Sequence, residues 1–112
     1  MKIFNYTPHA LALKTAERTL QLQPVGVARA TTESKIVGFI DDLPVMQKTF
    51  GKVYGLPEPN LVDEDTILIV SSLTAQAAKA ENHPLLSKMY VVNDTLRDAN
   101  GRITAATSLA KV

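Results

Sequence analysis

The fold of this chain is decided by the stretch from Asp65 to Glu81, which reads Asp-Thr-Ile-Leu-Ile-Val-Ser-Ser-Leu-Thr-Ala-Gln-Ala-Ala-Lys-Ala-Glu. The four consecutive branched apolar residues at 67–70 predict a strand buried on both faces, because a strand with one solvated face would alternate polar and apolar residues. Two serines follow, and either can accept a hydrogen bond from the free amides of a helix start. The alanine-rich run after them has high helix propensity. We therefore expect an inner strand that leads directly into a helix.

The junction between this strand and this helix is a candidate anion site. The first amides of a helix have no partner within the helix, and the helix dipole adds positive charge at that end. We expect a phosphate to be met there by the amides of Ser72, Leu73 and Thr74 and by the hydroxyls of Ser71 and Ser72. Capping of the helix alone explains the two serines equally well.

The size and composition of the chain indicate one soluble domain, residues 1–112, in the cytoplasm. Cysteine is absent, which excludes disulfides and thiolate metal sites. No apolar run approaches the roughly 20 residues that span a membrane, and polar residues come too early for a signal peptide. Twelve basic and eleven acidic residues without a block of like charge argue against binding to duplex nucleic acid.

Short apolar patterns predict further strands on both sides of the central stretch. Alternating leucines predict a hairpin over residues 11–22, and Asn100-Gly101 predicts a tight turn because it accepts positive φ angles. A turn is expected near Glu33 and Ser34. Other strands are expected at residues 2–6, 27–32, 35–40, 45–50, 89–92 and 102–109. These elements predict an α+β fold: a mainly antiparallel, twisted β-sheet of about six to eight strands with one principal helix packed on it.

The polar corner at residues 5–9 is the candidate for acid-base chemistry. His9, close to Thr7 and Asn5, is a candidate general acid or base, the role that histidine fills most often in enzymes that work near neutral pH. The alternative is a corner between strands that its own polar side chains cap. His83 is not spaced from His9 as zinc ligands on one helix are, and the acidic residues lie in turn-like runs, so we expect no metal. The chain has no Gly-rich phosphate loop and no nucleophile elbow, and we expect no cofactor.

Arg29 is the candidate for binding a phosphate. It alternates with alanines in the stretch 27–32, which places Arg29 and Thr31 on one face of a strand with room for a ligand. The alternative is a solvated residue on an edge strand. Phe50, Tyr54 and Tyr90 are able to stack on a base, although aromatic residues near strands more often belong to a core or an interface.

Five segments, in chain order, carry a resemblance to a known family. They are Asn5–His9, Val27–Ala30, Phe50–Pro57, Ile69–Ser72 with the helix after it, and Arg97–Ile103. Together they resemble a family of small uncharacterised proteins found in phages, prophages and bacteria, and only residues 85–92 depart from its pattern. Small phage proteins of this size often blunt host defence, and some bind or destroy nucleotide signals, so the resemblance implies an anti-defence role.

The leading hypothesis is therefore a phage-type sponge that binds a phosphate-bearing nucleotide, such as a cyclic dinucleotide or an ADP-ribose-like signal, without turnover. Its candidate ligand-binding residues are Asn5, His9, Arg29, Thr31, Ser71, Ser72 and Thr74. The alternative is a phosphodiesterase-like enzyme with His9, assisted by Thr7, as acid or base, and a third option is a structural or protein-interaction module. We also expect a homo-oligomer, because one short helix cannot cover both faces of such a sheet.

Overall fold

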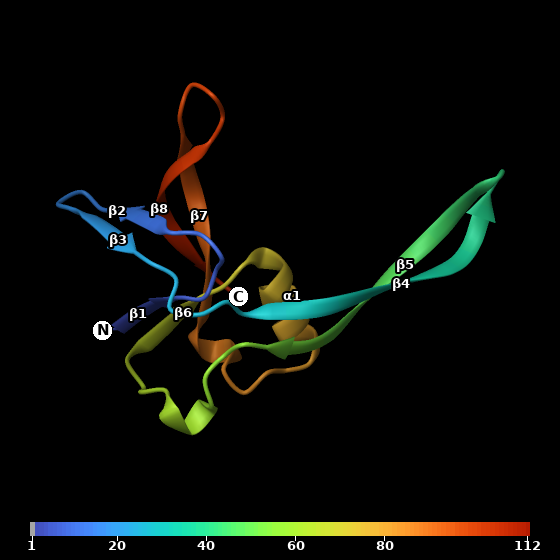
Figure 1. Cartoon of the computed structure of the whole chain (residues 1–112), viewed down its shortest axis with the longest axis horizontal. Coiled ribbons are helices and arrows are strands. Elements are labelled where there is room, and N and C mark those ends of the chain that lie inside the picture. Colours follow the sequence, from blue (N-terminus) through green and yellow to red (C-terminus); the bar gives the residue numbers. More distant parts are fainter. Residues whose placement is uncertain (1) are drawn as a thin grey trace.

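The computed structural model describes residues 2–112 and contains a six-stranded sheet, a separate two-stranded hairpin and one α-helix (Figure 1). This arrangement confirms an α+β fold that is mostly sheet. The strands are β1 (Lys2–Asn5), β2 (Leu11–Lys14), β3 (Thr19–Leu22), β4 (Arg29–Ile40), β5 (Leu43–Tyr54), β6 (Thr66–Ile69), β7 (Met89–Arg97) and β8 (Ile103–Lys111). The helix is α1 (Ser72–Ala80), and short 3-10 turns lie at Pro59–Leu61 and Leu86–Lys88.

Strand β6 is an inner strand of the sheet, as the sequence predicted. It pairs with β1 on one side and β7 on the other, and Leu68, Ile69 and the following Val70 are buried. Leu68 belongs to the apolar cluster under α1, whereas Ile69 belongs to a second cluster on the other face with Leu13 and Ala106. The consecutive branched residues therefore serve two cores at once, because successive side chains of a strand point to opposite faces.

The sheet is mixed and barrel-like, so the prediction of a mainly antiparallel sheet is confirmed only in part. Its strand order is β1-β6-β7-β8-β2-β3, and the pairs β1/β6, β6/β7 and β2/β8 are parallel. Helix α1 connects β6 to β7 and supplies the long crossover that two parallel neighbours require. Beyond β3, a parallel bridge joins Pro24 to Asn5 of β1, and the Val25 amide donates to the Asn5 carbonyl (3.0 Å). These contacts bring the two edges of the sheet together.

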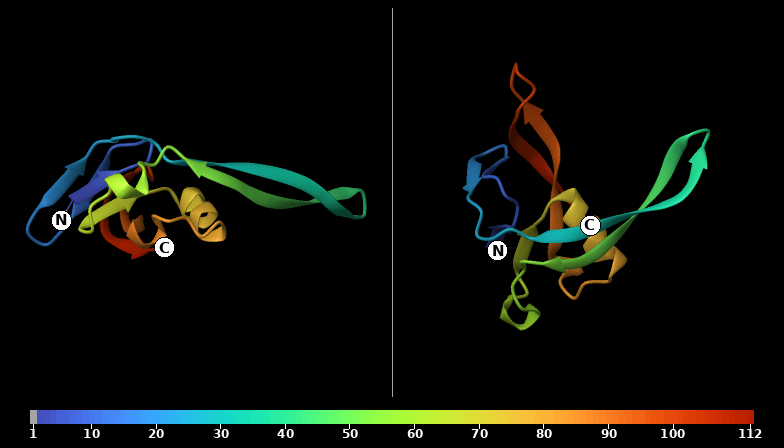
Figure 2. Two further views of the ribbon diagram at one scale, coloured as in Figure 1. Left: turned by 90° about the horizontal axis from the view of Figure 1, so that it is seen from below. Right: turned by 45° about the vertical axis from the view of Figure 1, so that its right-hand side comes forward.

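Strands β4 and β5 form a long hairpin, which we call the arm, that extends away from the rest of the molecule (Figures 1 and 2). The prediction of two strands with a turn near Glu33 and Ser34 was wrong, because β4 runs without interruption from Arg29 to Ile40. The arm turns at Asp41 and Asp42, and Asp41 has a φ of 51°, as the first position of a tight hairpin turn often does. The remaining strands and α1 form what we call the body.

The root of the arm, its end nearest the body, packs against α1. Ala28, just before β4, and Val53 of β5 are buried in one cluster with the helix residues Ala75, Ala77 and Ala78. Alanines have short side chains, so the helix lies close to the arm while it covers only a short length of it. Beyond this contact the arm leaves the body.

Candidate functional site

A cleft of about 330 Å³, which we call the root cleft, lies where the arm, the start of α1 and the corner after β1 meet. It is lined by Pro8, Val27, Ala28, Arg29, Ala30, Thr31, Tyr54, Ser71, Leu73 and Thr74. Four of the predicted ligand-binding residues, Arg29, Thr31, Ser71 and Thr74, therefore come together in one place although the two pairs are 40 positions apart in the sequence.

The start of α1 is tied to the arm by its hydroxyl groups. Ser71 is the N-cap, and its Oγ accepts a hydrogen bond from the Thr74 amide (3.3 Å) and donates to Thr74 Oγ1 (3.0 Å). Thr74 Oγ1 donates in turn to the carbonyl oxygen of Ala28 (3.0 Å). This chain confirms that Ser71 caps the helix. It also commits both hydroxyl groups to holding the wall of the root cleft. The amides of Ser72 and Leu73 have no acceptor inside the helix, because they belong to its first turn.

Arg29 and Tyr54 are the cation and the aromatic ring that the arm contributes to the root cleft. They are direct partners in the register of β4 and β5, so their side chains share one face of the hairpin. Both side chains are exposed, and Arg29 is the only charged residue among the described residues that line the root cleft. A cation and an aromatic ring thus lie next to each other at a positively polarised helix start.

Thr31 reaches the root cleft from an irregular part of the arm. The register shifts between Ala30 and Thr32, and Gly51 lies across from this bulge. A Cβ atom on Gly51 would collide with the hydroxyl oxygen of Thr31. Glycine at position 51 therefore allows the Thr31 side chain to lie against the backbone of β5.

Other predicted site residues lie elsewhere. Ser72, the first residue of α1, lines a shallow depression with Val91 and Lys111 on a different side of the helix. Of the aromatic candidates, only Tyr54 lines the root cleft, since Phe50 lies further along the arm and Tyr90 lies on β7.

Asn5 holds the corner between β1 and β2 together. It is buried, and its Nδ2 donates to the carbonyl oxygens of His9 (2.7 Å) and Leu22 (3.0 Å). Its Oδ1 accepts from the amide (2.9 Å) and the hydroxyl (2.6 Å) of Thr7. The polar groups of Asn5 and Thr7 therefore form hydrogen bonds within this corner, which agrees with the alternative interpretation of a capped strand corner.

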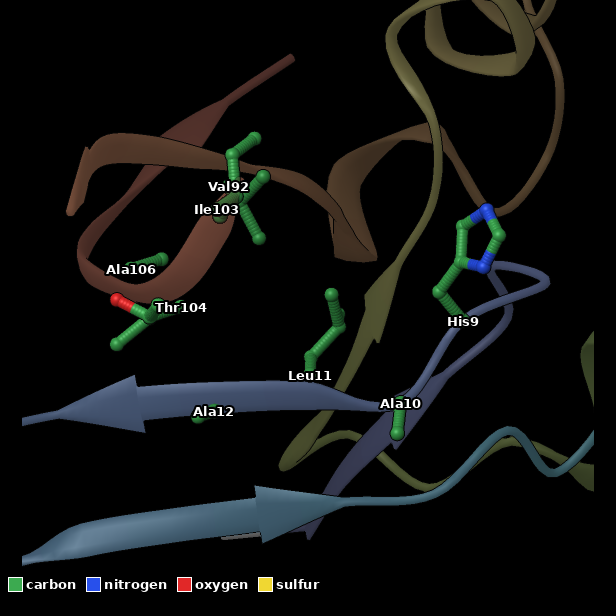
Figure 3. Close-up of a pocket in the computed structure, with 9 residues that line it drawn as sticks. His9, Ala10, Leu11, Ala12, Val92, Ile103, Thr104 and Ala106 are labelled. Atoms are coloured by element: carbon green, nitrogen blue, oxygen red, sulfur yellow. The ribbon is translucent and has the colours of Figure 1, made fainter. Parts of the chain in front are cut away.

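His9 lines a second cleft of about 240 Å³ between β2 and the β7–β8 hairpin (Figure 3). Its ring lies at one end of this cleft, and the other walls are mainly apolar side chains such as Leu11, Val92 and Ile103. His9 is the only ionisable side chain among the described residues of the lining. The structure thus separates His9 from Arg29, which the sequence analysis had joined in one set.

His83, the second histidine, has a local structural role. Its Nδ1 accepts a hydrogen bond from the Leu85 amide (3.1 Å), and its own amide donates to the Ala78 carbonyl (2.9 Å) just after α1. Within residues 2–112 no three His, Cys, Asp or Glu side chains gather in a group able to hold a metal ion.

Two general comparisons complete the description of the chain. No helix within the described residues has both the length and the apolar character needed to cross a membrane. Models of known protein families, characterised proteins and solved structures give no significant match to this sequence.

Proposed function

We propose that this protein captures a small phosphate-bearing nucleotide in the root cleft and holds it without turnover, as a phage-type sponge for a cyclic dinucleotide or ADP-ribose-like signal of host defence. The observation that carries the proposal is the direct pairing of Arg29 with Tyr54 beside the start of α1. A guanidinium binds a phosphate through two parallel hydrogen bonds, and a tyrosine ring stacks on a base. One side of the cleft thus offers a group that binds the phosphate of a nucleotide and a group that stacks on its base.

The charge of the root cleft supports an anionic ligand. Arg29 is the one charged group of its described lining, and the first turn of α1 adds the positive end of the helix dipole. The amide of Leu73 and the hydroxyl of Thr31, both from residues that line the cleft, are the further donors we assign to the phosphate. The hydroxyls of Ser71 and Thr74 already form hydrogen bonds that hold the helix start against the arm. We therefore assign them to positioning the cleft wall and not to the ligand.

The volume of the root cleft supports a small ligand. Pockets for small molecules range from about 300 to 1,000 Å³, and the root cleft lies at the lower end of that range. One nucleotide unit with its phosphate fits this size. For a cyclic dinucleotide, the second unit would extend along the exposed surface of the arm.

Titration calorimetry with ADP-ribose, cyclic di-AMP and inorganic phosphate as probes tests the proposal. Arg29→Ala should weaken binding of the nucleotide probes by about ten- to a hundredfold, because a charge-assisted hydrogen bond is worth roughly 1.5–3 kcal/mol. Its melting temperature should match that of the wild type, since Arg29 is exposed. Arg18→Ala, an exposed arginine in the turn between β2 and β3, and His9→Ala are the matched controls and should bind like the wild type. Equal affinity in wild type and Arg29→Ala would reject the site.

Recovery of the probe separates capture from catalysis. The protein is incubated with a nucleotide, denatured, and the nucleotide is analysed by mass spectrometry. A sponge returns it intact, whereas a phosphodiesterase-like enzyme returns products. If products appear, His9→Ala should lower their rate at least a hundredfold for His9 to be the acid or base. If no nucleotide shifts the melting temperature, a structural or protein-interaction role takes precedence.

A further inference from the structure

The arm carries most of the large apolar side chains that the protein leaves exposed. Of thirteen such residues within positions 2–112, eight lie on β4 and β5: Ile36, Val37, Phe39, Ile40, Leu43, Met46, Phe50 and Tyr54. Near the tip, Phe39 is 67% and Leu43 70% exposed. The other five are spread over four elements and a loop. Single apolar residues on a surface are ordinary, but a contiguous patch marks an interaction site.

Four of these side chains lie along one face of the arm. Ile36 pairs directly with Met46, and cross-strand partners share a face. Phe39 pairs with Pro44 in the same way. Pro44, Met46, Lys48 and Phe50 occupy alternate positions of β5, so they point to the same side, and Lys48 lies between Met46 and Phe50. We call this row the apolar stripe: Ile36, Phe39, Met46 and Phe50.

The apolar stripe begins where α1 stops covering the arm. Phe50 lines a shallow depression with Ala77 and Ala80 of the helix, so the innermost residue of the stripe lies beside α1. Further out, the views in Figures 1 and 2 show the hairpin alone, without another element over either face. A two-stranded hairpin in water is only marginally stable, which means that this length of arm needs a covering surface.

The charges of the arm are separated along its length. Between residues 36 and 46 the charged side chains are Asp41 and Asp42, which give the tip a charge of −2. Nearer the root, Lys48 lies on the face of the apolar stripe and Lys52 lies at the bulge, which gives this end a charge of +2, whereas Arg29, Glu33 and Lys35 occupy the alternate positions of β4 that point to the other face. Because one end of the arm is acidic and the other is basic, two arms packed antiparallel bring opposite charges together at both ends.

We infer that the covering surface is the arm of a second copy of this chain, packed antiparallel about a two-fold axis so that each acidic tip lies on the basic root of the other copy. A two-fold interface uses the same patch on both partners, and the opposite charges at the two ends of one arm satisfy that requirement. The axis falls near the pair Lys35 and Gln47, close to the middle of the arm. Phe39 of one copy then lies close to Phe50 of the other.

The dimensions of the arm suit such an interface. Two 12-residue strands extend about 40 Å, which is long enough for the whole apolar stripe of one copy to lie along that of a second copy. A lipid membrane fits the arm less well, because Asp41 and Asp42 stand at the extreme tip and would have to enter the bilayer ahead of the apolar residues. The same two carboxylates argue against a nucleic acid.

Sedimentation velocity without nucleotide tests the assignment first. The wild type should be a dimer at tens of micromolar, and Phe39→Glu should be a monomer with an unchanged circular dichroism spectrum, since residue 39 is far from both cores. Leu61→Glu is the matched control, because Leu61 is 73% exposed but lies on the body, and it should remain a dimer. A monomeric wild type, or a dimer that survives Phe39→Glu as well as it survives Leu61→Glu, would overturn the inference.

A charge exchange between two variants identifies the partner. The tip variant combines Asp41→Asn, which tolerates the positive φ at position 41, with Asp42→Lys; the root variant combines Lys48→Glu with Lys52→Glu. Each variant alone should be largely monomeric, because its tip and root now carry like charges. An equimolar mixture should form a heterodimer. A mixture that stays monomeric while the wild type binds vesicles of phosphatidylcholine and phosphatidylglycerol would overturn the inference in favour of a lipid surface. Both experiments omit nucleotide, so their failure leaves the proposed function untouched.

Discussion

The body and the arm are built from the same kind of strand, yet they bury their side chains to opposite extents. In the body, Leu68 and Ile69 of the four-residue strand β6 are fully enclosed, and one apolar cluster lies on each face. In the arm, only Val53, at the root, is buried among the residues of two 12-residue strands. Burial of apolar area is the main favourable term in folding, so the body has its own source of stability and most of the arm does not.

This difference assigns separate tasks to the two regions. The body holds α1 and the barrel-like sheet in place, and through Thr74 and Ala28 it fixes the root of the arm. The arm adds Arg29 and Tyr54 to the root cleft and then presents its apolar stripe to solvent. We therefore expect substitutions in the body to change folding and substitutions along the arm to change association.

A matched pair of leucine truncations should give the largest contrast between the two regions. Leu68→Ala should lower the free energy of unfolding by about 2–5 kcal/mol, because it opens a cavity under α1. Leu43→Ala, at the tip, should change it by less than about 0.5 kcal/mol. Urea denaturation of dilute protein, followed by circular dichroism, measures both. Similar losses in the two variants would mean that the arm shares the stability of the body.

The closure of the sheet should give the next largest effect. Asn5→Ala removes a buried amide that makes hydrogen bonds to three residues; the Leu22 carbonyl then loses its side-chain donor, and the His9 carbonyl keeps only the Thr7 hydroxyl. We expect a loss of about 2–3 kcal/mol in the free energy of unfolding. Asn93→Ala, whose amide bonds Ser108 and Asp94 on the surface, is the control and should cost much less. If the two asparagines cost the same, Asn5 does not hold the closure.

The helix cap that anchors the arm should have a moderate effect. Ser71→Ala should destabilise the protein by about 1 kcal/mol, because the Thr74 amide loses its acceptor. Ser72→Ala, one position later, should be neutral or slightly stabilising, since alanine is the better helix former. Thermal denaturation of the two variants compares them, and a greater loss in Ser72→Ala would contradict the assignment of the cap.

A surface ion pair of the body should give the smallest effect. Lys2 Nζ donates a hydrogen bond to Asp63 Oδ2 (2.6 Å), and this bond together with the Lys2 charge lowers the pKa of Asp63. A carboxyl group whose pKa is depressed by folding stabilises the folded state above its unfolded pKa, and loses that contribution as the pH falls through the folded pKa.

Asp63→Asn tests this pH dependence. The variant should be slightly less stable than the wild type at pH 7, and the difference should disappear in acid as the wild-type carboxyl takes up its proton. Glu17→Gln, in the exposed turn between β2 and β3, removes a carboxylate that forms no ion pair within residues 2–112 and is the control. Melting curves from pH 7 to pH 2 give the comparison, and a difference that grows toward acid would have the wrong sign.

Much of the body could be predicted from the sequence because its signals are local. Each signal lies within the element that it predicts: the branched run at 67–70, the capping serine and the leucines of the 11–22 hairpin. The structure pairs Leu13 with Leu20, as a hairpin requires, and buries Leu68, Ile69 and Val70. The parallel pairing of β1 with β6 could not be predicted in this way, since it depends on residues more than 60 positions apart. The sequence pattern divides β4 in two, because the polar residues around Glu33 and Ser34 resemble a turn. Because β4 is exposed on both faces, its polar and apolar residues do not alternate in the way that identifies a half-buried strand.

The root cleft could be foreseen only in its separate parts. Arg29 and the serines gave signals of their own, but the position of Tyr54 opposite Arg29 requires β4 to continue from Arg29 to the turn at Asp41 and Asp42, and it requires the two register shifts along the arm to cancel. Asn5 and His9 are polar residues in one short corner, which made both of them candidates for the ligand site. No local pattern shows that Asn5 is buried or that His9 lines a different cleft.

Hydrogen exchange at two protein concentrations tests the central claim most directly, namely that the body is stable alone and that the arm depends on a second copy. Amide exchange is followed by mass spectrometry in peptides from residues 32–48 and 66–80. At high concentration both regions should be protected. On dilution below the dissociation constant, or in Phe39→Glu, the arm should exchange much faster while residues 66–80 keep their protection. An arm whose protection is the same at both concentrations and in the variant would contradict the account.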